Sequence, residues 1–226
     1  MLSDSLKSET RNLHTAVENS AFVQALFRGG LKQSAYALFL RNLREIYAAL
    51  ERGLERQSPG SPASLVWSPA LRRLPAIDRD LDALHGPNWA EVLDTLPATV
   101  RYVERLDRLS ESRPELLVAH AYVRYLGDLN GGQALARLVM RRFEPADGQG
   151  VEFYDFGEAD VIGKLKQGFK VGLDEIGRTM HDDASIVDEA QLAFRLHAEL
   201  FDELAIACQV VMRPVVEPID MPTTGA

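Results

Sequence analysis

The chain has 226 residues, of which 46% are hydrophobic, and a formal net charge of −8. An acidic chain without a basic run is not expected to bind nucleic acid. Its one cysteine, Cys208, excludes an internal disulfide and any site that needs several thiolates. The polar N-terminus does not resemble a signal peptide, and no apolar run approaches the roughly 18 residues of a membrane span. We therefore expect a soluble, cytoplasmic protein that does not bind membranes.

Apolar residues recur at helical spacing along almost the whole chain, as at Tyr36, Leu40, Leu43 and Tyr47. In chain order, the predicted helices are residues 5–20, 21–27, 32–57, 74–84, 98–109, 114–143, 158–176 and 183–208. Residues 58–69 are a loop rich in proline, serine and glycine, and residues 151–156 are the one strand-like stretch. No composition break divides the chain, so we expect one all-α, multi-helix domain over residues 1–212. Repeated prolines mark residues 213–226 as a mobile tail.

The predicted helix over residues 114–143 is interrupted by Gly-Asp-Leu-Asn-Gly-Gly at positions 127–132. Each glycine inside a helix destabilises it by roughly 1 kcal/mol relative to alanine. Three glycines in one helix therefore need a structural or functional explanation. Asn-Gly-Gly is typical of a turn, and GxxxG spacing is also typical of close helix packing. Alternatively, Gly127 and Gly131 share one face of a kinked helix and leave a bare ridge for a broad, flat ligand. The segment alone leaves these interpretations open.

Five histidines are candidate ligands. His85 and His181 are expected at the surface, whereas His120 and His197 lie in apolar helices, where a histidine is commonly a hydrogen-bonded core residue. His14 has Glu18 one turn away on the same helix face.

Lys7 lies two turns in the other direction, about 10 Å along a continuous helix axis. An imidazole and a cation so placed could bind the metal and a carboxylate of one porphyrin, although a solvated lysine is the ordinary alternative. A di-iron carboxylate site is not expected, because no Glu-x-x-His pair is present. Neither a Ser-His-Asp signature nor a phosphate-binding loop is present.

Three segments together resemble the haem oxygenase family: LKSETRNLHTAVEN, ELLVAHAYVRYLGDLNGGQ and AFRLHAELFDEL, in this order. The resemblance covers about residues 4 to 210. It implies an all-α fold in which haem lies between the first helix and a kinked, glycine-containing distal helix. It also implies oxidation of haem to biliverdin (mainly the α isomer), carbon monoxide and ferrous iron. The reaction would use O2 and electrons from an external reductase, which could be a ferredoxin, a flavodoxin or a flavin reductase.

The resemblance also implies roles for individual residues. His14 is similar to the proximal iron ligand, with Glu18 as the partner that orients its ring. On the distal side, the matching residues are Gly127 and Gly131 against the haem, and Asp128 with Tyr47 and Arg124 in a water network. The positions that contact the haem propionates are Lys7, Tyr122, Lys166 and Lys170. The aromatic positions near the haem are Phe194 and Phe201.

The sequence departs from the family pattern at three positions. Asn130 replaces a common serine, His197 stands where an asparagine often joins the distal network, and Lys170 replaces the arginine of the animal type. Lysine keeps the positive charge but lacks the bidentate geometry of arginine, so the haem would be held less tightly. The absence of a C-terminal membrane anchor favours the soluble, bacterial type.

Two other functions remain possible at this stage. A haem-binding carrier or sensor would share His14 but would not need Asp128 beside a glycine ridge. A helical enzyme acting on thiamin-like or quinone-like substrates would not bind haem. For the reductase, the sequence offers two candidate docking faces, one with Arg137, Arg141 and Arg142, and one with Arg101, Arg105 and Arg108.

Overall fold

The computed structural model describes residues 1–144, 149–180 and 182–210. Every regular element in this part of the chain is a helix, which confirms the all-α prediction. The α-helices are α1 (Leu2–Glu9), α2 (Arg11–Glu18), α3 (Ala21–Arg28), α4 (Gln33–Glu55), α5 (Leu74–His85), α6 (Trp89–Val92), α7 (Pro97–Ser112), α8 (Leu117–Ala121), α9 (Gly127–Phe143), α10 (Ala159–Thr179) and α11 (Asp183–Ala207). None of these helices is long and apolar enough to cross a membrane. The predicted tail and His181 lie outside the described residues.

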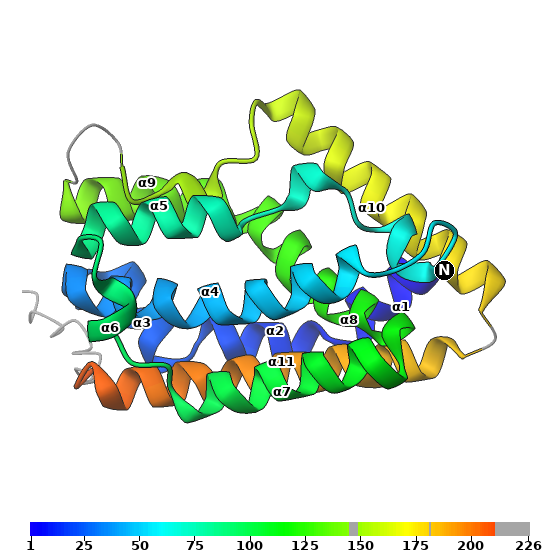
Figure 1. Cartoon of the computed structure of the whole chain (residues 1–226), viewed down its shortest axis with the longest axis horizontal. Coiled ribbons are helices and arrows are strands. Elements are labelled where there is room, and N and C mark those ends of the chain that lie inside the picture. Colours follow the sequence, from blue (N-terminus) through cyan, green and yellow to red (C-terminus); the bar gives the residue numbers. More distant parts are fainter. Residues whose placement is uncertain (145–148, 181, 211–226) are drawn as a thin grey trace, which may run out of the picture.

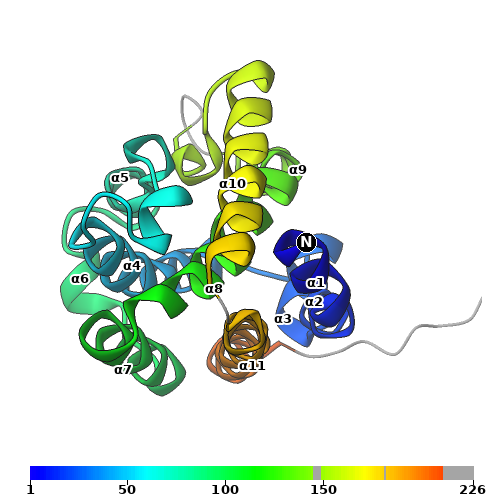
Figure 2. The ribbon, with the colours of Figure 1, turned by 90° about the vertical axis from the view of Figure 1, so that its right-hand side faces the viewer.

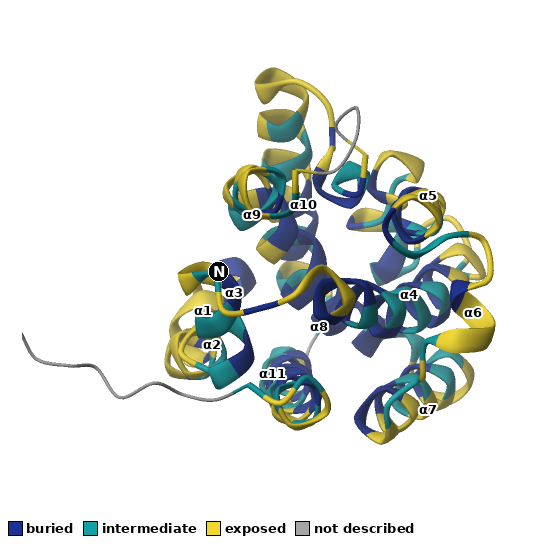
Figure 3. Ribbon diagram, turned by 90° about the vertical axis from the view of Figure 1, so that its left-hand side faces the viewer, coloured by how far each residue is buried: buried dark blue, intermediate teal, exposed yellow. Residues whose placement is uncertain are grey.

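Helix α4 runs through the middle of the molecule and packs against α5 and α7 (Figure 1). Its buried face carries Tyr36, Leu40, Leu43 and Tyr47, all with no solvent exposure, as their spacing predicts. Helices α1, α2 and α3 gather on one side, with α9 and α10 above them and α11 below (Figure 2). In contrast to α4 and α8, α1 and α2 expose much of their surface (Figure 3).

The predicted first helix over residues 5–20 is divided in two. Helix α1 ends at Glu9 and α2 begins at Arg11, while the Thr10 hydroxyl donates to the Leu6 carbonyl at 2.6 Å. Such bonds from a threonine to its own helix can bend the backbone. Lys7 and His14 therefore do not share one continuous helix, and the predicted separation of 10 Å along one axis does not apply.

The glycine segment is helical, so its interpretation as a turn was wrong. The irregularity comes just before it, in the π-helical segment η4 (Tyr122–Leu126), which joins α8 to α9. A π-bulge widens the turn and redirects the axis, and Figure 1 shows the chain changing direction between α8 and α9. The kink thus precedes Gly127, and the glycines continue a regular helix.

Two smaller predictions also need correction, and one helix was missed. The strand-like stretch forms a 3-10 helix over Glu152–Tyr154, and the short helix α6 was not predicted. His85 ends α5 with its Nδ1 atom buried, so it is not a surface loop residue.

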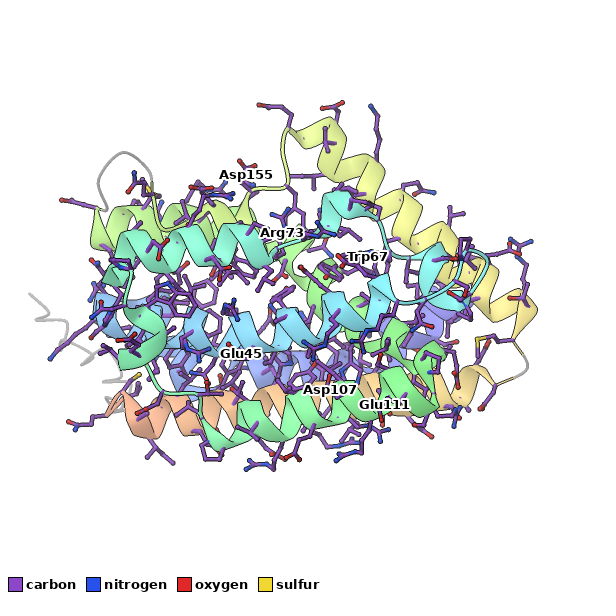
Figure 4. The ribbon with its side chains drawn as sticks, viewed as in Figure 1. Glu45, Trp67, Arg73, Asp107, Glu111 and Asp155 are labelled. Atoms are coloured by element: carbon purple, nitrogen blue, oxygen red, sulfur yellow. The ribbon has the colours of Figure 1, made fainter. Side chains whose placement is uncertain are left out.

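The segment directly before α10 is tied to the start of α5 by a buried arginine. Arg73 donates from its guanidinium to the carbonyls of Phe153, at 3.3 Å, and Asp155, while its backbone N–H donates to Glu51. Figure 4 shows Arg73 and Asp155 on these neighbouring segments. Because α10 follows this segment, these bonds fix where α10 begins.

Candidate functional site

A cavity of about 830 Å³ lies between the N-terminal helices, η4 with α9, α10 and α11. Ten of the predicted site residues line it: Lys7, His14, Glu18, Tyr122, Gly127, Gly131, Lys166, Lys170, Phe194 and Phe201. The other three, Tyr47, Arg124 and Asp128, do not line the cavity and instead form a buried cluster. Residues from distant parts of the sequence therefore meet at one site.

On the wall formed by α2, the His14 imidazole lies beside a carboxylate. The distance between His14 Nδ1 and Glu18 Oε2 is 3.4 Å, at the outer limit of a hydrogen bond, and the two side chains are 53% and 59% exposed. The Phe194 ring meets the imidazole edge-on, with 5.9 Å between ring centroids. Because Nδ1 faces Glu18, the other ring nitrogen, Nε2, is the one free to bind a metal ion.

The wall formed by α9 has two positions without side chains. A Cβ atom placed on Gly127 or Gly131 would meet no atom within 4 Å, whereas one on Gly132 would lie 3.3 Å from Cδ1 of Tyr154. The first two glycines therefore face open cavity space, while the third packs against the protein. A flat ligand could approach the α9 backbone along this bare face.

Cations and a phenol line another part of the cavity. Lys7 comes from α1, and Lys166 and Lys170 stand one turn apart on α10. The Tyr122 hydroxyl lies 3.5 Å from the Thr10 hydroxyl, so it is close to α1 as well. Helices α1 and α10 are joined by a hydrogen bond from Ser3 N–H to Asp174 at 3.0 Å. This arrangement suits a ligand with an apolar body and carboxylates at one edge.

Arg124 is the centre of the buried cluster. Its Nη2 donates to Asp128 Oδ1 at 3.0 Å and its Nε to the Tyr47 hydroxyl at 3.2 Å. Tyr47 in turn donates a hydrogen bond to Asp128 Oδ2. The Nη1 atom lies 2.7 Å from His197 Nε2. The side chains bond directly to each other, so the predicted network members are held together without intervening water.

Burial dominates the proton affinities in this cluster. It raises the pKa of Asp128, although Arg124 and the bond from Tyr47 oppose the shift, and it raises the pKa of Tyr47 well above its usual value. Arg124 remains a cation. Asp128 is therefore a carboxyl group with an increased affinity for a proton, placed one residue from Gly127 of the cavity wall.

The expectation that His120 is a hydrogen-bonded core residue is confirmed. Its Nε2 lies 2.9 Å from Glu189, and its Nδ1 lies 3.1 Å from the Tyr102 hydroxyl. Burial lowers the pKa of His120. Burial would raise the pKa of Glu189, but bonds from His120 and Arg105 lower it to about 2. His120 thus has both nitrogens occupied within the core.

Sequence reasoning missed several residues that line the cavity, including Arg11, Phe22, Phe27 and Phe39. Arg11 could have been found, because it follows Lys7 by four residues. The phenylalanines could not, since an aromatic residue at helical spacing is usually part of the core. Asn130, one of the three departures from the family pattern, also lines the cavity.

The arginines of the two candidate docking faces differ in whether they form ion pairs with carboxylates of the same chain. Arg101 is paired with Glu199 and Glu203, and Arg105 with Glu189. On the other face, Arg137 and Arg141 are exposed on α9, and no ion pair is formed by either within the described residues.

Arg108, on the first face, lies 3.9 Å from Glu104. On the second face, the Arg142 guanidinium packs over Gly29, where it would lie 2.3 Å from an added Cβ atom. Arg142 thus contacts α3 through this packing but stays exposed, as Arg137 and Arg141 do, so all three arginines leave accessible positive charge on this face.

Comparison with known proteins gives one family. The family model described as Heme oxygenase matches residues 1–203. The chain is 37% identical over 205 residues to "Heme oxygenase 1" of Homo sapiens. This match covers 90% of this chain and 71% of the human protein. It is 35% identical over 203 residues to "Heme oxygenase 1" of Nostoc sp., with 90% and 85% covered.

Solved structures give the same result. Heme oxygenase-2 from Synechocystis sp., determined in complex with heme and NO, superposes with a TM-score of 0.87 at 31% identity, over 92% of this chain and 86% of that one. The heme oxygenase from Leptospira interrogans superposes with a TM-score of 0.82 at 35% identity, over 89% and 98% of the two chains.

Proposed function

Because this chain belongs to the haem oxygenase family and is an oxidoreductase that degrades haem, we propose that it opens the ring at a meso carbon to give biliverdin, carbon monoxide and ferrous iron. The oxidant is O2, and the electrons come from an external donor protein. One observation carries the proposal. A single cavity has an oriented imidazole on one wall and the side-chain-free face of Gly127 and Gly131 on another, with the Asp128 cluster directly behind.

The residues that line the cavity fit haem as the substrate. His14 binds the iron through Nε2, while Glu18 accepts from Nδ1–H and keeps the ring in one tautomer. Phe194 and Phe201 provide apolar contacts for the ring system. The absence of Cβ atoms at Gly127 and Gly131 leaves room for the ring beside the α9 backbone.

Lys7, Lys166 and Lys170 hold the two propionates by charge, and the Tyr122 hydroxyl donates a hydrogen bond to one of them. These contacts set how the haem is rotated in its plane, and so which meso carbon faces the distal wall. We propose that this seating gives mainly the α isomer. Lys170 holds its propionate as a point charge, less rigidly than an arginine would.

Bound haem supplies the iron that activates O2 and the carbon that is oxidised. Asp128, whose pKa is raised by burial, takes up protons and passes them towards the cavity through water, since its carboxyl group does not itself line the cavity. Tyr47 and Arg124 fix the orientation of this carboxyl group. Protons thus reach the distal side without a strong acid in direct contact with the iron.

The electron donor docks on the face of α9 that carries Arg137 and Arg141. This choice is supported by the exposure of the two side chains and by the ion pairs that neutralise the alternative face around Arg101 and Arg105. A ferredoxin, flavodoxin or flavin reductase with an acidic surface would be the complementary partner.

The test is to incubate the purified protein with haem, O2 and either ascorbate or a reductase, and to identify the pigment by chromatography and mass spectrometry. Biliverdin together with released carbon monoxide is the expected result. Recovery of intact haem from a stable complex would instead indicate a carrier or sensor. Failure to bind haem would indicate an enzyme for another substrate.

A further inference from the structure

His197 occupies a distinctive place in the buried cluster. Arg124, on η4, is held by acceptors from three different helices: Tyr47 from α4, Asp128 from α9 and His197 from α11. The bond to His197 is the shortest of the three from the guanidinium, at 2.7 Å, against 3.0 Å to Asp128 and 3.2 Å to Tyr47. His197 is only 2% exposed, so water does not compete for this bond.

The contacts of His197 determine where its proton lies. An arginine side chain has only donors, so Nε2 of His197 must accept from Arg124 Nη1. The other nitrogen, Nδ1, lies 3.2 Å from the carbonyl of Ala193, which can only accept. The ring therefore carries one proton, on Nδ1, and is neutral. Protonating Nε2 would place two donors and two positive charges against each other.

Three ionisable groups face His197, and two of them, Arg124 and His120, favour its neutral state. The three are Arg124 from η4, His120 from α8 and Tyr102 from α7, whose ring meets the imidazole at 86° with 5.1 Å between centroids. Within the described residues, no carboxylate lies within 4 Å of His197. Burial, and then the charge of Arg124, lower the pKa of His197 well below its usual value.

We propose that His197 is a positioning residue for haem oxidation in this chain, acting as a permanently neutral acceptor that aims the Arg124 guanidinium at Asp128. The ring is anchored on its own helix through Nδ1, so its Nε2 lone pair points in a fixed direction. If this acceptor were lost, Nη1 would be left buried without a partner, and the guanidinium would move to find another. This inference rests on the proposed function only for the role of Asp128 in the reaction.

Loss of the His197 acceptor should raise the pKa of Asp128. Arg124 lowers the pKa of Asp128 against the effect of burial. A displaced guanidinium would lower it less, so the proton affinity of Asp128 would rise. We expect His197→Leu to shift the Asp128 titration upward by roughly one pH unit, which is a tenfold change in proton affinity. His197→Gln offers an acceptor oxygen and should restore most of the original titration.

The experiment has one arm without haem. In the apoprotein, 15N NMR of the imidazole should show the Nδ1–H tautomer of His197, unchanged between about pH 5 and 8. The Arg124 Nε–H should exchange slowly with solvent in the wild type and His197→Gln, and faster in His197→Leu. Tyr102→Phe is the matched control, because it keeps the ring against His197 and removes only the hydroxyl bonded to His120.

The second arm is the pH profile of kcat for bilin formation, in which His197→Leu should show the upward shift and Tyr102→Phe should not. A titrating His197, an Nε2–H tautomer, or identical pH profiles in wild type and His197→Leu would overturn the proposal. If His197→Leu does not fold, the wild-type tautomer and the His197→Gln profile still decide it. A locked tautomer in a protein that yields no bilin would overturn the proposed function and support the Arg124 geometry.

Discussion

Replacing Gly131 should change stability and haem binding in opposite directions. A Cβ atom at this position meets nothing within 4 Å, and the residue lies inside helix α9. Alanine removes the entropic cost of a helical glycine, so Gly131→Ala should stabilise the apoprotein by about 0.5–1 kcal/mol. In a chain of this size, that is a rise in Tm of roughly 1–4 °C. The space beside Gly131 belongs to the cavity, so the same change reduces the room for ligand.

A larger side chain makes the second effect measurable. Overpacking a well-fitted site costs about 1–3 kcal/mol. Gly131→Leu should therefore weaken haem binding between roughly fivefold and a hundredfold. The measurement is a haem titration followed by absorbance, next to thermal unfolding of each apoprotein. Gly168→Ala on α10 is the matched control, because its Cβ atom also meets nothing and it does not line the cavity. It should gain the same stability with unchanged haem affinity.

A second control variant should lower the stability of the fold instead of raising it. A Cβ atom on Gly172 would lie 2.1 Å from the Leu65 carbonyl oxygen, so Gly172→Ala should destabilise the fold. The reasoning would be refuted if Gly131→Leu bound haem as tightly as the wild type, or if Gly131→Ala lowered the Tm.

Four further predictions address the proposed roles. His14→Ala should lose the absorption spectrum of histidine-ligated haem, and added imidazole should restore it; an unchanged spectrum would remove His14 as the ligand. Asp128→Ala should reduce the rate of bilin formation about a hundredfold, because proton delivery is lost, with haem affinity nearly unchanged, because Asp128 does not line the cavity; a normal rate would contradict this. Lys170→Glu should repel a propionate and change the ratio of biliverdin isomers, which chromatography would measure, and a constant ratio would exclude Lys170 from the site. Arg137→Glu should slow reduction by an acidic ferredoxin most at low salt, because exposed charges are screened beyond about 8–10 Å at physiological ionic strength; kinetics independent of salt would argue against this docking face.

The sequence predicted those features that depend on local spacing. The period of apolar residues located α4, α5, α7, α10 and α11 to within a few residues, because each helix buries one continuous face. The same reasoning could not find the π-helical segment before Gly127. A π turn depends on a shift of backbone hydrogen bonds that the surrounding packing stabilises, and no local propensity marks it. The break at Thr10 is similar, since threonine is common inside helices.

Contacts between residues far apart in the chain also could not be predicted from the sequence. Arg101 and Arg105 resemble a basic docking face when only their spacing on α7 is considered. Their partners, Glu199 and Glu189, lie 98 and 84 residues away on α11, so the neutralisation of this face appears only in the folded chain. The direct bond between Arg124 and His197 spans 73 residues and was hidden for the same reason.

The buried cluster is difficult to explain as a device for stability. Taking Arg124 and Asp128 out of water costs several kcal/mol, and replacing such a pair with apolar residues is often neutral or stabilising by about 1–4 kcal/mol. The surrounding helices already have an apolar core, in which Leu40, Leu43 and Ile46 have no solvent exposure. The cluster nevertheless collects acceptors from α4, α9 and α11 around one guanidinium, immediately behind the glycine wall of the cavity. A costly arrangement placed there is what proton delivery to the cavity requires, and packing alone does not.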